Sequence, residues 1–204
     1  MKRWTKRLID FFLATVGLII LSPFLAIISL AILLTMGPPI FFWQVRAGYK
    51  GRAFSLIKFR TMLFGCDAQG QPLPDADRIT KVGSFLRQYS LDELPQLWNI
   101  WLGEMSFVGP RPLLMEYLPR YSPEQARRHE VKPGLTGWAQ VNGRNSLSWE
   151  ERFQLDIWYA DHWNLGLDAK IFWKTLQRVP QRKGVSLEGY ATMPEFTGSK
   201  QKMR

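Results

Sequence analysis

The sequence has 204 residues, of which 46% are hydrophobic, and this is enough for one domain with an apolar core. Its 27 Lys and Arg residues outnumber its 17 Asp and Glu residues, and the net charge of +10 favours an anionic partner: nucleic acid, an anionic bilayer or a phosphorylated substrate. With one cysteine, Cys66, and two histidines, His129 and His162, the composition excludes an internal disulfide and a zinc site built from Cys and His. Any bound metal should therefore be a hard ion with oxygen ligands.

Residues 11–36 contain no charged side chain. The segment exceeds the roughly 20 residues that a helix needs to cross a bilayer, and it is too long for the apolar part of a cleavable signal peptide. Basic residues flank it on both sides, so the positive-inside rule favours both ends in the cytoplasm. They are Lys2, Arg3, Lys6 and Arg7 before the segment and Arg46, Lys50, Arg52, Lys58 and Arg60 after it.

Ser22 and Pro23 lie near the middle of this apolar segment. Pro23 removes the backbone hydrogen bond to Ile19 and kinks the helix, and the Ser22 hydroxyl can satisfy a freed carbonyl. We therefore predict that the segment enters one leaflet, bends at Ser22 and Pro23, and returns to the same side. The alternative is an ordinary kinked helix that crosses the bilayer once.

Residues 40–45 and 53–62 favour two short strands joined by a glycine-containing turn, hence a β-hairpin. The aromatic composition of the first strand is typical of segments at the level of the lipid headgroups. Lys58 and Arg60 share one face of the second strand by its period of two, and we expect this cationic face to bind phosphate. The alternative is a solvated edge strand.

Residues 65–77 are rich in Gly, Pro, Asp and Gln and favour a mobile loop. Asp75 and Asp77 in this loop resemble the D-x-D motif by which many glycosyltransferases bind a metal and a nucleotide-sugar, although no parallel-sheet pattern precedes them. Residues 78–89 then favour a short basic amphipathic helix. This helix would carry Arg87 towards the acidic motif that follows it.

Asp92 and Glu93 are adjacent carboxylates at the expected start of a helix, in the motif SLDELPQLWNIWLGEMSFVGPRP. The positive end of a helix dipole should keep Asp92 ionised and attract an anionic ligand, and an ionised carboxylate can attack phosphorus. The spacing of Ser90 and Glu93 equally suits a capping box. Because Pro95 crowds the preceding turn, we expect the regular helix to begin near residue 94 or 95, with the two carboxylates just outside it.

Arg111 ends the same motif between Pro110 and Pro112. Proline restricts both its own backbone and that of the residue before it, so the guanidinium is presented with little freedom and suits a phosphate oxygen. The alternative is a plain turn that terminates the helix.

The remainder favours short helices at residues 113–121 and 123–132, the second capped by Ser122. Longer helices are expected at 148–162, capped by Ser148, and at 168–179, followed by an irregular tail. Residues 132–145 form a polar, glycine-rich stretch that suits a sugar or a base, with structural turns as the alternative. The candidate binding residues of this half are Gln140, Asn142, Arg144 and Asp156.

Six segments within residues 6–190 are similar to those of a known family. They are KRLIDF, LSPF, KFRTM, SLDELPQLWNIWLGEMSFVGPRPLL, RHEVKPGLTGWAQVNGRN and GVSLEGY. In these segments the chain resembles the small bacterial sugar transferases that act as monotopic polyprenyl-phosphate phosphoglycosyl transferases, especially the PglC type. The resemblance implies transfer of a sugar-1-phosphate from a UDP-sugar to a polyprenyl (undecaprenyl) phosphate with release of UMP, as the first membrane step of glycoconjugate assembly.

The resemblance also implies roles for individual residues. Asp92 would be the nucleophile that forms a phospho-aspartyl intermediate, and Glu93 would act with a required Mg2+, bound at Asp92 and Glu93. Lys58, Arg87 and Arg111 would lie around the phosphates. This chemistry depends on positioning, a divalent ion and fixed cations.

We therefore expect an α+β, mainly helical fold with an N-terminal re-entrant membrane helix broken at Ser22 and Pro23, a small β-hairpin, and interfacial amphipathic helices around a cytoplasmic active site. The expected parts are the re-entrant helix at 1–37, the catalytic domain at 38–185 and an irregular basic tail at 186–204. The expected location is the inner membrane, with anionic bilayer lipids and downstream membrane glycosyltransferases as further partners. A membrane-anchored nucleic-acid-binding module is the main rival, but the sequence has no helix-turn-helix, zinc-finger or RRM signature, so we expect no nucleic acid.

Overall fold

The computed structural model describes residues 2–65, 69–71, 73–143, 146–178 and 195–198. Its first half comprises α1 (Lys2–Met36), β1 (Phe41–Ala47), η1 (Tyr49–Gly51), β2 (Ala53–Phe59), α2 (Asp75–Arg78), α3 (Lys81–Gln88), η2 (Leu91–Gln96) and α4 (Leu97–Leu102), where η marks a 3-10 helix. Its second half comprises β3 (Ser106–Val108), η3 (Met115–Arg120), α5 (Pro123–Ala126), η4 (Arg127–Glu130), β4 (Gly134–Thr136), α6 (Trp138–Asn142), α7 (Trp149–His162) and α8 (Leu165–Arg178). The expected mainly helical α+β fold with a hairpin and a long apolar N-terminal helix is confirmed.

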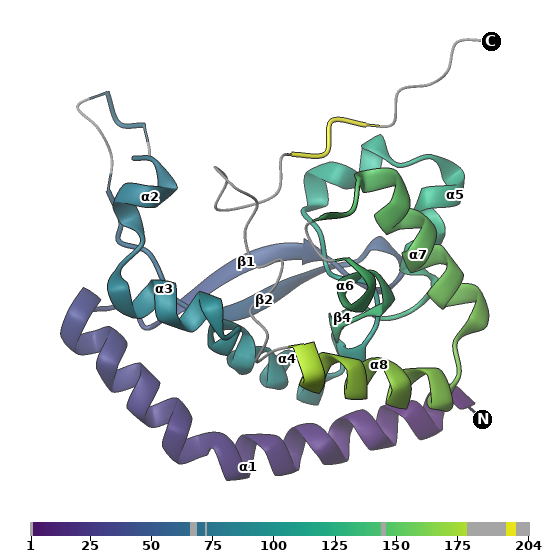
Figure 1. Ribbon diagram of the computed structural model, residues 1–204, viewed down its shortest axis with the longest axis horizontal. Helices are drawn as coiled ribbons and strands as arrows, with labels where there is room; N and C mark the ends of the chain where they lie inside the picture. Colours follow the sequence, from purple (N-terminus) through teal and green to yellow (C-terminus); the bar gives the residue numbers. More distant parts are fainter. Residues whose placement is uncertain (1, 66–68, 72, 144–145, 179–194, 199–204) are drawn as a thin grey trace.

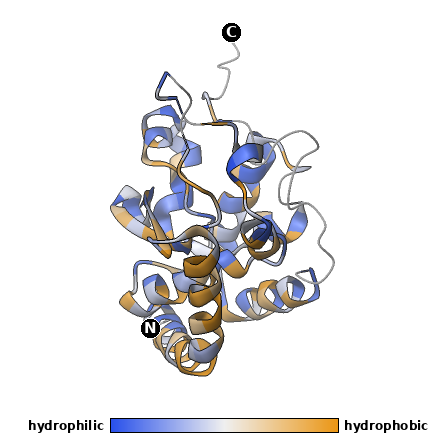
Figure 2. Cartoon of the chain, turned by 90° about the vertical axis from the view of Figure 1, so that its left-hand side faces the viewer, coloured by the Kyte–Doolittle hydropathy of each residue, from blue (hydrophilic) through white to orange (hydrophobic). Residues whose placement is uncertain are grey.

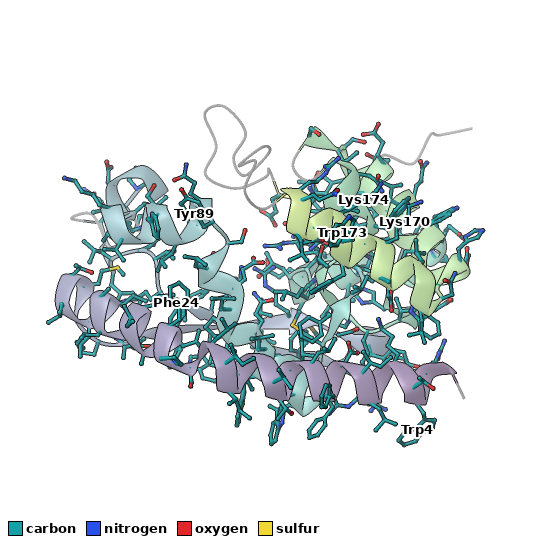
Figure 3. The ribbon with its side chains drawn as sticks, turned by 60° about the horizontal axis from the view of Figure 1, so that its bottom comes forward. Trp4, Phe24, Tyr89, Lys170, Trp173 and Lys174 are labelled. Atoms are coloured by element: carbon teal, nitrogen blue, oxygen red, sulfur yellow. The ribbon has the colours of Figure 1, made fainter. Side chains whose placement is uncertain are left out.

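Helix α1 runs beneath the rest of the molecule as one long, bowed helix (Figure 1). It is long and apolar enough to cross a membrane, with a mean hydropathy of 2.7 in its most apolar window. It continues through Pro23, and the Ser22 hydroxyl donates a hydrogen bond of 2.8 Å to the Ile19 carbonyl, as expected from the sequence. The apolar residues concentrate along α1 in Figure 2, and Trp4 points away from the domain in Figure 3.

Both ends of α1 are attached to the domain above it. Near its start, Lys6 forms an ion pair with Asp168, Arg7 donates to the carbonyls of Ile100 and Trp101, and Asp10 accepts from Ser106. At its other end, the Arg60 guanidinium donates to the last carbonyls of the helix and its exit, those of Met36, Gly37 and Pro38. A cation there also suits the negative end of the helix dipole.

The predicted hairpin is confirmed, with β1 and β2 antiparallel and Phe41 opposite Phe59. Its free edge at β2 is covered by Asn99, whose side chain accepts from the Ile57 amide at 3.1 Å and donates to the Ser55 carbonyl at 2.7 Å. This side chain is almost fully buried and satisfies backbone groups that an edge strand would leave unpaired. It thereby fixes η2 and α4 along the edge of the sheet.

A second sheet was missed by the sequence analysis. Strands β3 and β4 pair in parallel, with Ser106 opposite Gly134 and Val108 opposite Thr136. Residues 132–145 were expected to form a loop, whereas the structure has β4 and α6 in this stretch. The pair joins the two halves of the domain.

The helices of the second half gather beside the hairpin, at the right of Figure 1. The predicted caps of α5 and α7 are confirmed, since Ser122 and Ser148 each form a capping box. Most of the expected tail lies outside the described residues, including GVSLEGY, but Phe196 is buried among Tyr117, Trp149 and Phe153. This part of the tail is irregular, as expected, and packs into an aromatic cluster.

Candidate active site

The two adjacent carboxylates lie in η2, a 3-10 helix of about two turns that precedes α4. The regular helix begins at Leu97, two or three residues later than expected, because Pro95 is accommodated in the 3-10 helix. Ser90 takes a left-handed backbone conformation with φ of 57° and its side chain makes no capping bond. The capping-box interpretation of Ser90 and Glu93 is therefore wrong, and the Glu93 side chain is available for other partners.

Glu93 is held by two cations. Its Oε1 accepts hydrogen bonds from Lys58 Nζ at 2.7 Å and from Arg111 Nη2 at 2.6 Å, and Arg111 Nη1 lies 3.4 Å from Oε2. Burial acts to raise the pKa of Glu93, but the positive charges of Arg111 and Lys58 outweigh it and hold this pKa below its usual value. Glu93 is thus a fixed negative charge.

Asp92 is buried too, but its closest cation is more distant. Lys58 Nζ lies 3.9 Å from Asp92 Oδ2, beyond hydrogen-bond range. Burial and the neighbouring charge of Glu93 raise the pKa of Asp92 to about 6, against the opposing effect of Lys58, Arg111 and Arg87. A helix dipole was expected to favour the ionised form of Asp92, whereas here burial disfavours that form. Its oxygens are less engaged with cations than those of Glu93.

Three of the predicted phosphate-binding residues meet at these carboxylates. Lys58 and Arg111 contact Glu93 directly, and Arg87 lies close enough to lower the pKa of Asp92. Arg87 is oriented by a hydrogen bond of 2.9 Å from its Nε to the Thr61 hydroxyl. The Arg111 side chain remains 42% exposed, so it borders the open side of the cluster.

Arg60 is not part of this cluster. Strand β2 ends at Phe59, although the Arg60 amide still donates to the Ile40 carbonyl at 2.9 Å. The Arg60 guanidinium binds the carbonyls at the end of α1 instead. The structure therefore assigns Arg60 a structural contact that the sequence did not indicate.

Arg46 was missed as a site residue by the sequence analysis. Gln44 and Arg46 lie on the same face of the hairpin as Lys58, and Gln44 accepts a hydrogen bond from the Arg46 guanidinium. Burial and the nearby positive charge of Arg111 lower the pKa of Arg46 to about 10. The alternation of the first strand already places positions 44 and 46 on one face. Only the register of the hairpin shows that this is the face of Lys58.

The remaining candidates lie away from the two carboxylates. Gln140 donates to the Leu135 carbonyl and Asn142 to the Trp138 carbonyl, so both make local contacts, and Arg144 lies outside the described residues. Asp156 is fully buried and accepts from Arg128 Nε at 3.0 Å and from Nη2 at 2.7 Å. None of these described side chains contacts Asp92 or Glu93.

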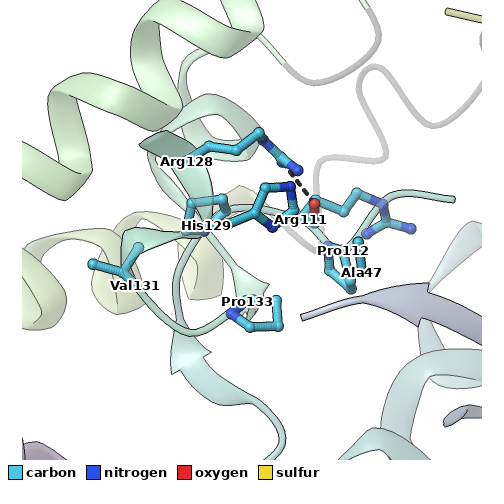
Figure 4. A pocket seen from close by; sticks show the side chains of 8 residues that line it. Ala47, Arg111, Pro112, Arg128, His129, Val131 and Pro133 are labelled. Carbon is cyan, nitrogen blue, oxygen red and sulfur yellow. Dashed lines mark hydrogen bonds between the residues drawn. The ribbon is translucent and has the colours of Figure 1, made fainter. Parts of the chain in front are cut away.

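Asp156 nevertheless supports the site through Arg128. Arg128 Nη2 donates to the backbone carbonyl of Arg111 at 2.8 Å, as the dashed line in Figure 4 shows. Arg111, Pro112, Arg128 and His129 line a shallow pocket in this view. The buried ion pair of Asp156 and Arg128 therefore supports the backbone that presents the Arg111 guanidinium.

The oxygens of Asp92 and Glu93 suit one hard divalent ion. Among the described residues no group of three or more His, Cys, Asp or Glu side chains forms a complete metal cage. Mg2+ is usually bound by one or two carboxylates together with substrate phosphates and water, and two adjacent carboxylates fit this pattern. A cation would also stabilise the ionised form of Asp92, which burial and Glu93 disfavour.

The chain is similar to known bacterial sugar transferases. The family model described as bacterial sugar transferase matches residues 1–182. The uncharacterized sugar transferase EpsL of Bacillus subtilis is 50% identical over 195 residues, which are 95% of this chain and 96% of that protein. The exopolysaccharide production protein ExoY of Sinorhizobium fredii is 38% identical over 88% of this chain and 87% of its own length.

Some matching proteins are much longer. The UDP-glucose:undecaprenyl-phosphate glucose-1-phosphate transferase of Escherichia coli is 40% identical over 184 residues, which are 85% of this chain and 40% of that protein. The chain thus matches less than half of the length of this relative.

Proposed function

The chain belongs to the bacterial sugar transferase family, and from this premise we propose that it transfers a sugar-1-phosphate from a UDP-sugar to a polyprenyl phosphate. The observation that carries the proposal is the adjacent pair of carboxylates with opposite pKa shifts, Asp92 and Glu93, inside a cluster of Lys58, Arg87 and Arg111. Such a cluster suits a phosphate-containing substrate, because its cations outnumber its carboxylates. The name of the Escherichia coli relative describes the same class of reaction.

The proposed reaction has two steps. An Asp92 carboxylate oxygen attacks the phosphorus that bears the sugar, the bond from that phosphorus to the bridging oxygen breaks, and UMP leaves with the bridging oxygen. A phosphate oxygen of the lipid then attacks the same phosphorus and breaks its bond to Asp92. The products are a polyprenyl diphosphate sugar and the regenerated carboxylate, so one nucleophile serves both half-reactions.

The neighbouring side chains orient and neutralise the phosphates. Lys58 and Arg111 are already aligned by Glu93, so they meet the charged substrate with little reorganisation. Arg87 lies close enough to affect the charge of Asp92 and is held by Thr61. Asp92 and Glu93 would hold Mg2+, which when bound supplies positive charge against the phosphate oxygens.

We also propose that α1 is re-entrant and that the active site faces the cytoplasm at the inner membrane. Both ends of α1 are bound to the same domain, through Lys6 and Arg7 at one end and Arg60 at the other. A helix that crossed the bilayer with the domain on one side would separate these contacts. The bend at Ser22 and Pro23 supports a helix that returns to the face it entered.

The test is the identity of the nucleotide released when purified protein meets UDP-sugars, polyprenyl phosphate and Mg2+. We expect UMP from the wild-type protein and no turnover from Asp92→Asn, because an amide is a poor nucleophile. Asp77→Asn is the matched control, since Asp77 belongs to the D-x-D motif, and it should release UMP normally. Release of UDP, or normal turnover by a well-folded Asp92→Asn protein, would contradict the proposal.

A further inference from the structure

An apolar cavity of about 340 Å³, here called the apolar slot, lies beneath the hairpin. One wall is the bend of α1, a second is one face of the hairpin, and the third is formed by η2 and α4. The lining residues are Leu18, Leu25, Phe41, Trp43, Ile57, Phe59, Pro95 and Trp98. All of these described lining residues are aliphatic or aromatic, and none of them is charged.

The slot opens to the apolar surface of the molecule. Trp43 and Trp98 are 55% and 45% exposed although they line it. Leu18 and Leu25, seven positions apart on α1, lie on one face of the helix and flank Ser22 and Pro23. An apolar cavity of this size is unfavourable for water and suits an apolar chain that enters from the bilayer.

The slot also lies near the proposed nucleophile, because Pro95 of η2 is one of its lining residues. Residues three apart in a 3-10 helix lie on the same side of it, so Asp92 sits directly above Pro95, about 6 Å along the axis of η2. The hairpin divides the two environments, since Ile57 and Phe59 face the slot while Lys58 points to the carboxylates. One end of the apolar slot therefore lies next to a group of cations.

This combination fits a molecule with an apolar chain and an anionic head. We propose that the slot binds the first isoprene units of the polyprenyl phosphate, with its phosphate directed to Asp92 between Lys58 and Arg87. The inference rests on the proposed function and adds where the lipid acceptor lies. The charge of the cluster selects the phosphate end, and the apolar lining selects the chain.

Kinetics of two half-reactions test the assignment. Leu25→Trp fills the slot from α1, whereas Ile20→Trp adds the same ring to the same helix at a position that is 67% exposed and does not line the slot. For Leu25→Trp we expect the KM for a long-chain polyprenyl phosphate to rise about tenfold, as when about two methylene groups lose their apolar burial. Exchange of labelled UMP into UDP-sugar, which requires no lipid, should stay within about twofold of wild type, because only the slot is blocked.

The control variant should behave as wild type in both assays. An unchanged KM for Leu25→Trp, or an equal rise for Ile20→Trp, would overturn the assignment of the slot. Wild-type protein without UMP exchange would refute the phospho-aspartyl route and not the slot, so the location of the lipid needs a measurement that does not depend on turnover.

That measurement is photo-crosslinking. A polyprenyl phosphate with a diazirine in its first isoprene units should label peptides that contain Trp43 or Trp98, and unlabelled polyprenyl phosphate should compete. Labelling confined to parts of α1 away from Leu18 and Leu25 would overturn the proposal. Equal competition by vesicles of phosphatidylglycerol would overturn it as well, because the slot would then bind any bilayer acyl chain.

Discussion

Arg111 donates to both oxygens of Glu93 from a backbone held between two prolines and by Arg128. Lysine at this position keeps the charge but loses the planar fork, and alanine loses both. If the fork matters in the transition state, Arg111→Lys should lose about 10- to 100-fold in kcat, nearly as much as Arg111→Ala, as expected for lost hydrogen bonds to a charged group. Steady-state kinetics of UMP release give both values.

A role of Arg111 that depends on charge alone predicts different kinetics. If Arg111 supplies only charge, lysine restores most of the rate and alanine mainly raises the KM for UDP-sugar. Normal kinetics of both variants would make Arg111 a turn residue. The phosphates would then depend on Lys58 and Arg87.

His129 gives a residue-level prediction for stability. Burial and then the neighbouring Arg128 lower the pKa of His129 to about 4, although its Nδ1 contacts the Gly48 carbonyl. The unfolded chain, with a histidine pKa of about 6.5, therefore binds more protons between pH 4 and 6.5, and stability falls as the pH drops through this window by up to about 3 kcal/mol. His129→Phe keeps a ring beside Tyr121 and removes this titration.

Chemical denaturation in detergent micelles at pH 7, 5.5 and 4.5 measures the difference between the two proteins. Carboxylates titrate in both, so only the difference reports on His129. We expect wild type to lose more stability than the variant as the pH falls. Parallel pH curves would show that His129 is accessible to protons in the folded state.

The residues of the site were predictable to different degrees. Asp92, Glu93 and Arg111 share one sequence motif, and Lys58 precedes them on a strand whose alternation is visible. The structure places the Arg60 guanidinium at the exit of α1, a tertiary contact that the strand pattern does not indicate. The partnership of Asp156 with Arg128 is a contact across 28 positions that no local pattern encodes.

At the scale of elements, α3 is placed by a close approach between backbones. A Cβ on Gly83 would lie 1.9 Å from the Thr61 carbonyl oxygen, so the helix packs on this strand exit only with glycine. Gly83→Ala should therefore destabilise the protein by about 2 kcal/mol, although alanine favours a helix, because overpacking against backbone outweighs propensity. Activity should fall as well, since Arg87 on α3 is oriented by Thr61.

Ser84→Ala is the matched control on the exposed side of the same helix, where only propensity acts. Thermal unfolding and UMP release of the two variants provide the measurement. Gly83→Ala with wild-type stability and activity would mean that α3 shifts freely against Thr61.

Elements with local signals were predicted, and elements made by distant contacts were not. The capping boxes at Ser122 and Ser148 need only residues within one turn, and the hairpin needs only alternation and a glycine turn. The parallel pairing of Ser106 with Gly134 joins three-residue strands 28 positions apart, which are too short to show a period. The apolar slot likewise exists only when α1, the hairpin and η2 meet.

In the whole molecule, α1 is a long helix that lies beneath the domain and is bound to it at both ends. Its 35 residues correspond to about 52 Å of helix, longer than the roughly 30 Å of bilayer hydrocarbon. Its two ends are bound to one domain, and α4 and α8 also expose large apolar side chains. Trp173 on α8, with Lys170 and Lys174 nearby in Figure 3, adds an aromatic and basic group typical of a membrane interface. The proposed active site thus lies above a broad apolar surface.

Replacing Ser22 and Pro23 by alanine and leucine should straighten α1, because the backbone bond to residue 19 is restored. A straight helix cannot keep Lys6 and Arg7 at one end and Arg60 at the other bound to one domain, so topology should change or the domain should lose activity. A reporter cysteine placed before Trp4 and labelled from the periplasmic side of intact cells measures the topology. We expect no labelling in the otherwise wild-type chain and labelling in the double variant. If the double variant remains unlabelled and fully active, the contacts at the two ends, and not Pro23, hold α1 in its re-entrant form, whereas labelling of the otherwise wild-type chain would refute re-entry itself.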